Sequence, residues 1–504
     1  MKRLKTICLS MLLAGAFNSN AQEAPKREFR GAWLQTVYQG QYASMNKAEL
    51  QNYLTALLDQ LRQTGINAII FQVRPAADAF YPSKLEPWSR FLTGRQGKAP
   101  LPAWDPMAFL IEECHKRNME FHAWLNPYRV TTSKNETLTF NHIYNRNPGW
   151  FVEYGDKIYF DPGLPQSRKF IREVVKDIVT RYDVDAIHMD DYFYPYPISG
   201  VEFPDQDTFE QYRKKMGFAA NQRNDWRRQN VNILIKGLNE DIKGIKPWVR
   251  FGISPFGIYR NQSSDPNGSK TRGLQNYDDL YADVLRWTEE GWVDYMLPQL
   301  YWEIGHKAAD YTTLIKWWNQ HANDRHMYIG QSIERSLDDK LNLTSSDSHF
   351  AEKMKLSRTL SSIDGNCFWY GYQIANNEHK IASALKKKYH VNPALIPAYS
   401  HLDQDAPKKV KGVKAKWTQN GYELSWKRRD TKDEMQKQVY YCIYRFEEDE
   451  KIDLEKSSNL VATTRETNYL LPYDDGRTKY KYVVTSVDRM HNESKKSRSK
   501  SVKL

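Results

Sequence analysis

Eight short segments in the first 390 residues are rich in β-branched and aromatic residues, and amphipathic stretches or long loops separate them. They are "FRGAWLQTVY", "INAIIFQVRP", "EFHAWLNPYR", "VDAIHMDDYF", "RFGISPFGIY", "VDYMLPQLYW", "MYIGQSIE" and "NCFWYGYQIA". The stretches between them, such as "KAELQNYLTALLDQLRQTG" and "SRKFIREVVKDIVTRYD", have the apolar spacing of helices that bury one face. Strands that alternate with helices predict parallel strands joined by right-handed crossovers.

The number of these units distinguishes between two architectures of the α/β class. Eight units that end near residue 390 match a (β/α)8 barrel, or TIM barrel. The rival, a doubly wound open sheet, carries a glycine-rich phosphate loop after its first strand, and the first segment is followed by no such loop. We therefore predict a (β/α)8 barrel over residues 22–390.

The pattern changes after residue 390. Residues 391–406 read as an extended exit segment and linker. Beyond them, "GVKAKWTQNGYELSWKRR" has the alternation of a hairpin with Asn420-Gly421 at its turn, and "QVYYCIYRF" and "KYKYVVTSVD" predict further strands. We therefore expect residues 407–504 to form a small all-β, immunoglobulin-like sandwich. Trp426 and the Tyr480/Tyr482 pair resemble the core pattern of fibronectin type III domains, which usually act as spacers or binding modules.

Two adjacent acids, Asp190 and Asp191, directly follow the apolar part of the fourth segment. Uncompensated carboxylates in a protein interior cost several kcal/mol each, so either a cation neutralises them or they stand at a cleft. In a parallel barrel the carboxyl ends of all strands meet at one face, where active sites form. We therefore favour a functional pair over the alternative in which one Asp caps a loop and the other pairs with a cation such as Arg74. His188 is either a partner that orients Asp190 or a core histidine.

An acid pair at this place predicts chemistry at a glycosidic bond. Such a reaction needs one group to protonate the leaving oxygen and a second to stabilise or attack the cationic sugar carbon. If the sugar carries an N-acetyl group, its amide oxygen can be the nucleophile, and one Asp would then orient the acetamide while the other donates the proton. Glu303, just past the sixth segment, is a third catalytic candidate, although an ordinary solvated loop position explains it equally well.

Sugar-binding candidates are the aromatic and polar residues near the ends of the predicted strands. Aromatic rings offer surfaces for the C–H faces of sugars, while amide and guanidinium groups bind hydroxyls or an acidic substituent. These candidates are Trp33, Gln72, Arg74, Asn126, Tyr192, Gln299, Tyr301 and Trp302. The chain contains 15 Trp and 32 Tyr, which suits a carbohydrate site but also the core of a large barrel.

The first residues, "MKRLKTICLSMLLAGAFNSNAQ", predict a signal peptide over residues 1–21, with a basic start, a short apolar run and small residues before the cut. The apolar run is too short for a permanent membrane span, and Cys8 lies inside it rather than at the cut. We therefore expect an exported protein, periplasmic or secreted, with neither an integral span nor a lipoprotein anchor.

Charge and cysteine content limit the kinds of binding partner and cofactor that we expect. Loss of the signal peptide, with three cations and no acid, lowers the formal net charge from +12 to +9, which suits an anionic surface such as cell-wall polymer or lipid headgroups. Nucleic acid is not expected for an exported chain without a binding motif. The three remaining cysteines are far apart, and His115 and His122 lack metal-site spacing, so we expect no disulfide framework, no metal and no cofactor. We expect a monomer.

Several long motifs resemble the bacterial glycosyl hydrolase-like 10 family over about residues 30–397. They are "FRGAWLQTV", "INAIIFQVRPAADAFYPSKLEPWSRFLTG", "HAWLNPYR", "VDAIHMDDYFYPYP" and "LPQLYW". The resemblance implies a barrel hydrolase of exported bacterial proteins, and at least one member resembles a glycosidase that cuts peptidoglycan glycan strands stripped of their peptides. We therefore expect an exported glycoside hydrolase, with peptidoglycan glycan as the favoured substrate. The alternatives are a non-catalytic, lectin-like barrel that binds glycans and a glycosidase that acts on dietary or host glycans.

Overall fold

The structure, a computed structural model, describes residues 24–337, 342–429, 431–473 and 476–503. The predicted signal peptide, residues 1–21, lies outside the described residues. Eight parallel strands close into a barrel in the order β1-β10-β9-β8-β7-β6-β3-β2. They are β1 (Phe29–Leu34), β2 (Ala68–Arg74), β3 (Glu120–Leu125), β6 (Ala186–Met189), β7 (Arg250–Ile253), β8 (Tyr295–Met296), β9 (His326–Ser332) and β10 (Ile363–Trp369). Each strand overlaps one of the eight predicted segments, so the predicted barrel is confirmed.

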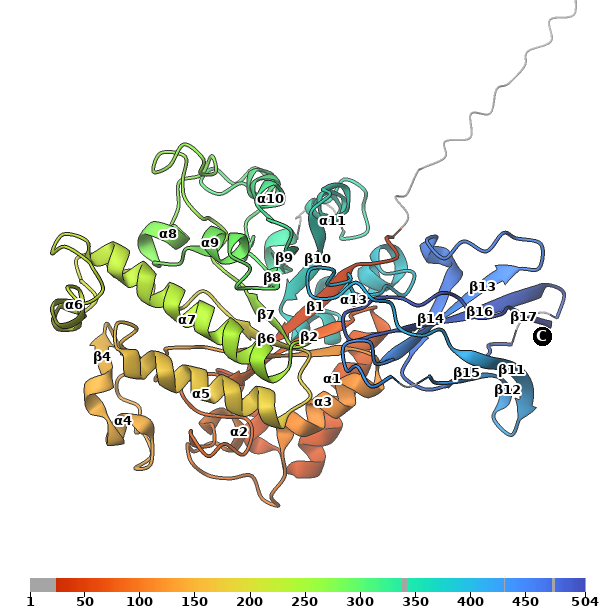
Figure 1. Ribbon diagram of the computed structural model, residues 1–504, viewed down its shortest axis with the longest axis horizontal. Helices are drawn as coiled ribbons and strands as arrows, with labels where there is room; N and C mark the ends of the chain where they lie inside the picture. The colour runs from red at the N-terminus through yellow and green to blue at the C-terminus, as the bar shows by residue number, and fades with distance from the viewer. Residues whose placement is uncertain (1–23, 338–341, 430, 474–475, 504) are drawn as a thin grey trace, which may run out of the picture.

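Helices surround the barrel (Figure 1). The longer ones are α1 (Lys47–Gln63), α3 (Pro106–Lys116), α5 (Pro165–Arg181), α7 (Arg223–Ile245), α10 (Tyr311–Gln320) and α11 (His349–Thr359). Shorter ones are α2 (Arg90–Thr93), α4 (Ile143–Arg146), α6 (Gln206–Tyr212), α8 (Asn276–Asp279), α9 (Val284–Glu289), α12 (Gly371–Ala375) and α13 (Ile381–Ala384), and a hairpin of β4 (Phe151–Tyr154) and β5 (Lys157–Phe160) lies among them. Helix α1 shows why these stretches fold: Asn46 and Glu49 form a capping box, and the leucines of one face are buried against the barrel.

The C-terminal part contains two antiparallel sheets. One consists of β11 (Lys411–Thr418), β12 (Gly421–Lys427) and β15 (Asn468–Leu470), and the other of β14 (Leu460–Thr464), β13 (Tyr440–Glu447), β16 (Lys479–Val487) and β17 (Lys500–Lys503). Strands β11 and β12 form the predicted hairpin, with Thr418 opposite Gly421. Trp426 packs in the shared core, with its ring 5.3 Å from that of Tyr441. The prediction of a small all-β domain after the barrel is confirmed.

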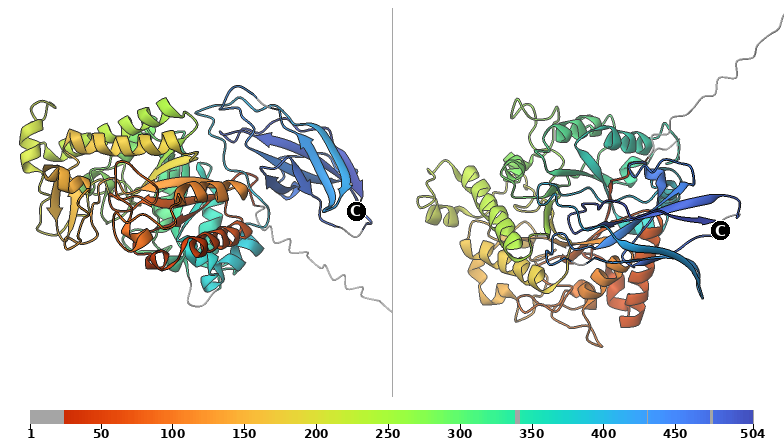
Figure 2. Two further views of the ribbon diagram at one scale, coloured as in Figure 1. Left: turned by 90° about the horizontal axis from the view of Figure 1, so that it is seen from below. Right: turned by 45° about the vertical axis from the view of Figure 1, so that its right-hand side comes forward.

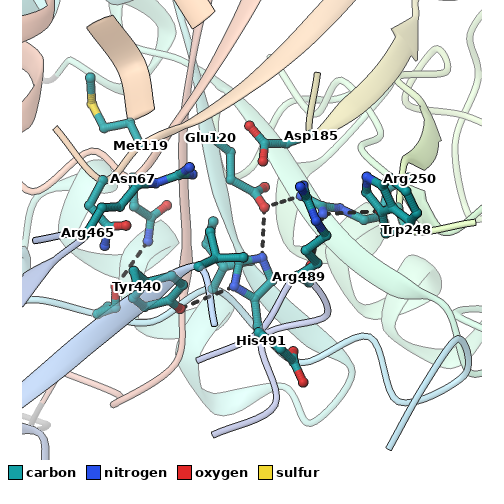
Figure 3. A pocket seen from close by; sticks show the side chains of 15 residues that line it. Asn67, Met119, Glu120, Asp185, Trp248, Arg250, Tyr440, Arg465, Arg489 and His491 are labelled. Atoms are coloured by element: carbon teal, nitrogen blue, oxygen red, sulfur yellow. Dashed lines mark hydrogen bonds and ion pairs between the residues drawn. The ribbon is translucent and has the colours of Figure 1, made fainter. Parts of the chain in front are cut away.

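The two sheets lie at one end of the long axis of the molecule and extend away from the barrel (Figures 1 and 2). They contact the end of the barrel at which the strands begin. There, His491 Nε2 lies 2.7 Å from Glu120 Oε1 at the start of β3, and Arg250 at the start of β7 pairs with the same carboxylate (Figure 3). The C-terminal domain therefore closes the end of the barrel opposite to the carboxyl ends of its strands.

The search for membrane-spanning segments covers only the described residues, and none of their helices combines the length and apolar character needed to cross a bilayer.

Candidate active site

A cavity of about 350 Å³ opens where the barrel strands end. Seven of the predicted site residues line it: Trp33, Asp190, Asp191, Tyr192, Gln299, Tyr301 and Trp302. They come from the first, fourth and sixth barrel strands and the loops that follow, so residues far apart in the chain meet at one face. The convergence follows from the barrel topology, because all parallel strands deliver their carboxyl ends to the same side.

Asp190 and Asp191 both face the cavity because strand β6 ends one residue earlier, at Met189. Neighbouring residues within a strand point to opposite sides, but the chain leaves the ladder before Asp190 and is free to turn. Both acids are nevertheless deeply buried, with 4% and 2% of their surface exposed. The cavity floor therefore holds two carboxyl groups that water barely reaches.

The Asp190 carboxyl is held by one of its two oxygens. Trp124 Nε1 donates a hydrogen bond to Oδ2 at 3.2 Å, and Asn126 Nδ2 donates to the same atom. Oδ1 is buried and has no hydrogen-bond partner among the described residues. Burial and the neighbouring Asp191 charge raise the pKa of Asp190 to about 7. Asp190 is therefore a carboxyl group that keeps its proton close to neutral pH.

The Asp191 carboxyl uses both oxygens. Tyr196 Oη donates to Oδ2 at 2.5 Å, and Gln299 Nε2 donates to Oδ1 at 3.2 Å. Burial raises the pKa of Asp191 to about 6, and the two donors limit the rise because they stabilise the charged form. Of the two acids, Asp191 is therefore the one that ionises first.

In the described part of the chain, neither acid forms an ion pair with a Lys, Arg or His side chain. The Arg129 charge lowers the pKa of Asp190, but its guanidinium donates to Asn126 Oδ1 at 2.7 Å and to the Pro75 carbonyl. Arg74, the cation that the structural alternative named, pairs instead with Glu86 at 2.5 Å. The acid pair is therefore not a neutralised structural element.

Four predicted site residues do not line the cavity. Arg74 is fully buried and donates hydrogen bonds to Glu86 and to two backbone carbonyls. Its predicted contact with substrate is therefore wrong. Gln72 and Asn126 lie behind the acids: Gln72 Nε2 donates to Asn126 Oδ1 at 2.6 Å, and Asn126 in turn holds Asp190. Glu303 lies outside the cavity wall, where its charge acts on the ammonium group of Lys353.

The suggestion that His188 orients Asp190 is wrong. Its Nε2 lies 3.0 Å from Ser254 Oγ and its Nδ1 lies 3.0 Å from Tyr295 Oη, inside the barrel. Tyr295 Oη also lies 2.9 Å from His122 Nδ1, and His122 Nε2 lies 2.9 Å from Glu120. A hydrogen-bonded chain thus runs through the barrel interior from Glu120 to Ser254 in the cavity.

The remaining lining residues had no predicted role in the site: Trp124, Tyr196, Ser254, Phe256, Arg335 and Trp369. Alternation along β3 offered a signal for Trp124, since it precedes Asn126 by two residues and shares its side of the strand. Ser254 lies within the fifth predicted segment, and Tyr196 lies in the aromatic run "YFYPYP" that follows the acid pair. No local pattern distinguishes Arg335 from other loop arginines.

In the part of the chain that the structure describes, no cluster of three His, Cys, Asp or Glu side chains is arranged to hold a metal ion. Cys114, Cys367 and Cys442 are buried and free.

Comparison with known proteins identifies a family and several similar proteins. The model of the glycosyl hydrolase-like 10 family matches residues 28–343. Glycosyl hydrolase YngK of Bacillus subtilis (strain 168) is 42% identical over 502 residues, which cover 97% of this chain and 96% of that protein. Glycosyl hydrolase DigH of Escherichia coli (strain K12) is 38% identical over 325 residues, 60% of this chain and 72% of that protein. The glycoside hydrolase domain of PgaB (BpsB) from Bordetella bronchiseptica has a TM-score of 0.46 and 12% identity, covering 72% of this chain and 99% of that one.

Proposed function

The chain belongs to the glycosyl hydrolase-like 10 family, and we propose that it is an exported glycoside hydrolase that cleaves the N-acetylhexosamine-containing glycan strands of peptidoglycan. One observation carries the proposal: two buried acids with raised pKa and no ion-pair partner among the described residues lie in a cavity lined by aromatic rings. Burying such a pair costs stability, and a cavity that needs a proton donor beside a carboxylate accounts for that cost.

Asp190 is the proton donor in this proposal. A pKa of about 7 leaves the group largely protonated at mildly acidic pH. Oδ2 already accepts two N–H donors, so the proton resides on Oδ1, which has no partner among the described residues. Asp190 then transfers this proton to the glycosidic oxygen as the bond between that oxygen and the anomeric carbon breaks.

Asp191 is the charged partner. Its pKa of about 6 and the donors Tyr196 and Gln299 favour the ionised form while Asp190 is still protonated. With an N-acetylated sugar, the acetamide oxygen attacks the anomeric carbon, and Asp191 accepts a hydrogen bond from the acetamide N–H and stabilises its positive charge. Water, deprotonated by the Asp190 carboxylate, then opens the cyclic intermediate and restores both acids.

The walls of the cavity suit a sugar ring. Trp33, Trp124 and Tyr301 surround Trp369, with ring centroids 6.2, 6.2 and 6.4 Å from its own. Aromatic faces can pack against the C–H face of a sugar while the amide of Gln299 and the hydroxyl of Ser254 remain beside its polar groups. The volume of about 350 Å³ falls within the range of about 300–1,000 Å³ typical of small-ligand pockets.

The test is incubation of the mature protein with peptide-free peptidoglycan strands and with chitooligosaccharides, followed by mass analysis of new chain ends. We expect new reducing ends with wild-type protein and none with Asp190→Asn or Asp191→Asn, both of which should still bind the glycan. The exposed Asp156→Asn is the matched control and should cleave normally. Binding without cleavage by the wild-type protein would replace the hydrolase with a lectin-like barrel, and cleavage of other polysaccharides alone would favour dietary or host glycans.

A further inference from the structure

Arg335 is the one cationic residue among the described residues that line the cavity. It lies in η3 (Glu334–Ser336), directly after strand β9. Its backbone is well fixed: the amide N–H donates to Ser332 Oγ at 3.3 Å, and Ser336 Oγ donates to the Ser332 carbonyl at 2.7 Å. The base of this side chain therefore has a defined place at the cavity mouth.

The guanidinium of Arg335 is exposed and forms no ion pair or hydrogen bond with the described residues around it. Two acids of the described residues in this region are engaged elsewhere. Glu334 accepts a hydrogen bond from Gln373 Nε2 at 3.1 Å, and Glu303 acts on Lys353. Arg335 thus differs from Arg74, whose donors are all satisfied inside the fold.

A second cation stands behind Arg335. The buried Lys353 Nζ donates to Ser336 Oγ at 3.0 Å, in the same short helix as Arg335. Burial lowers the pKa of Lys353 to about 7, Glu303 acts in the opposite direction, and the charge of Arg335 lowers it further. An anion at the mouth would face Arg335 and not Lys353, because Lys353 is fully buried and does not line the cavity.

The acids and Arg335 lie on different sides of the cavity. Asp190 and Asp191 follow β6, whereas Arg335 follows β9, and β7 and β8 lie between these strands in the barrel. A glycan that reaches the acids would therefore place another of its substituents near Arg335. An anionic substituent would be repelled by the Asp191 charge, and a free guanidinium offsets that repulsion.

We propose that Arg335 recognises a carboxylate on the glycan, so that strands whose sugars carry a free acid group bind better than neutral strands of equal length. A guanidinium matches a carboxylate with two parallel hydrogen bonds, which an amide cannot reproduce. In peptidoglycan the lactyl ether of the muramic sugar ends in a carboxylate only after the peptide has been removed. The inference thus deepens the proposed function, on which it rests for the glycan.

The experiment compares four ligands of equal length: a peptide-free peptidoglycan oligosaccharide, the same with its lactyl carboxylates converted to primary amides, a chitooligosaccharide, and an oligosaccharide of alternating N-acetylglucosamine and glucuronic acid. Turnover is measured with wild-type protein, and binding is measured by calorimetry with Asp190→Asn. We expect KM for the lactyl carboxylate ligand to be about 10-fold lower than for its amide, with similar kcat. Arg335→Gln should remove this difference, Arg335→Lys should retain part of it, and the exposed control Arg95→Gln should leave it unchanged.

Equal KM for the acid and the amide, or a difference that persists in Arg335→Gln, would overturn the proposal. Tighter, Arg335-dependent binding of the glucuronic acid ligand would retain it and assign the carboxylate to a uronic acid ring. Cleavage of acid and amide with equal efficiency would remove the inference and leave the hydrolase intact. If the ligands bind with an Arg335-dependent preference but none is cleaved, the role of Arg335 would stand and the hydrolase activity would be refuted. If no ligand binds and none is cleaved, both would be refuted.

Discussion

Buried acids lie at both ends of the same barrel, and their surroundings are opposite. At the end where strands begin, Glu120 is 4% exposed and contacts Arg250, His122 and His491. At the end where strands finish, Asp190 and Asp191 are equally buried, and their carboxyl groups receive hydrogen bonds from Trp, Asn, Tyr and Gln side chains. Burial alone therefore does not decide the role of an acid in this fold.

The charge partners make the difference. Burial raises the pKa of Glu120, but Arg250 and His491 more than offset this effect and hold the pKa well below its usual range. The cavity beside Glu120 measures about 30 Å³, room for one or two water molecules, against about 350 Å³ beside the Asp pair. The compensated acid fixes the C-terminal domain to the barrel, and the uncompensated pair faces space for a ligand.

The largest expected effect separates the two ends by activity. Asp190→Asn removes the proton donor, so we expect kcat to fall about 10³-fold on a substrate that the protein cleaves. Glu120→Gln should leave kcat per folded molecule within a few-fold of wild type, because Glu120 does not touch the cavity. Comparable losses of kcat in both variants, measured on samples with the same folded fraction, would erase the distinction.

The next largest effect distinguishes the acids at the two ends of the barrel by their contribution to stability. Glu120→Ala leaves the buried Arg250 without its carboxylate, and loss of one partner of a buried pair costs about 3–5 kcal/mol. Chemical denaturation should therefore show a large fall in the free energy of unfolding. The control is Glu112→Gln, whose carboxylate forms a solvent-exposed pair with Lys116 and should change stability by less than about 1 kcal/mol. Equal stability of the Glu120 and Glu112 variants would show that the contact between the domains does not contribute to the stability of the fold.

A smaller effect has the opposite sign at the cavity. The folded-state pKa of Asp190 is raised from 3.8 to about 7, so its contribution to stability is most favourable below the unfolded value and is lost as pH rises towards 7. Asp190→Asn should therefore be more stable than wild type at pH 8, by about 1–2 kcal/mol, and the gain should vanish near pH 4. Glu120 acts in reverse: its lowered pKa stabilises the fold above the unfolded value of 4.5, and this contribution is lost on acidification. Thermal unfolding at pH 4 and pH 8 measures how the contributions of Asp190 and Glu120 to stability change with pH. If Asp190→Asn were less stable than wild type at pH 8, the predicted contribution of Asp190 would be contradicted.

The smallest effect concerns the acidic limb of the pH–rate profile. Activity requires Asp191 ionised and Asp190 protonated, so the profile should be bell-shaped with limbs near pH 6 and pH 7. Tyr196→Phe removes a donor that lowers the pKa of Asp191, and the acidic limb should move to higher pH by about half a unit. Phe209→Leu, a buried change outside the cavity, is the control. An acidic limb that stays in place would assign it to another group.

The sequence predicted the features that depend on short stretches of chain. Each barrel strand has its own apolar segment, and the acid pair directly follows one of them, so both could be located without tertiary information. The convergence of Trp33, Asp190 and Gln299 then followed from the barrel topology.

The predictions that failed concern polar side chains whose partners lie far away in the sequence. Arg74 ends strand β2 and Arg335 follows strand β9, and only the fold shows that Glu86 neutralises the first while the second lines the cavity without an ion-pair partner among the described residues. The sequence left His188 as either a partner of Asp190 or a core histidine, and only the fold shows that its partners are Tyr295 and Ser254 inside the barrel. Partners of polar side chains come from distant segments, and local patterns do not identify them.

Titration of the carboxyl groups tests the central contrast most directly. Carbon-13 NMR of side-chain-labelled Asp and Glu should show Asp190 and Asp191 among the Asp carboxyls that titrate between about pH 6 and 7, and one of these signals should vanish in Asp190→Asn and another in Asp191→Asn. Burial also raises the pKa of Asp78 and Asp488 to about 7 and that of Asp161 to about 6, and these three signals should persist in both variants. The Glu120 signal, assigned with Glu120→Gln, should remain that of an ionised carboxylate at pH 4. Asp190 and Asp191 signals that titrate near pH 4, like those of ordinary surface acids, would contradict the account.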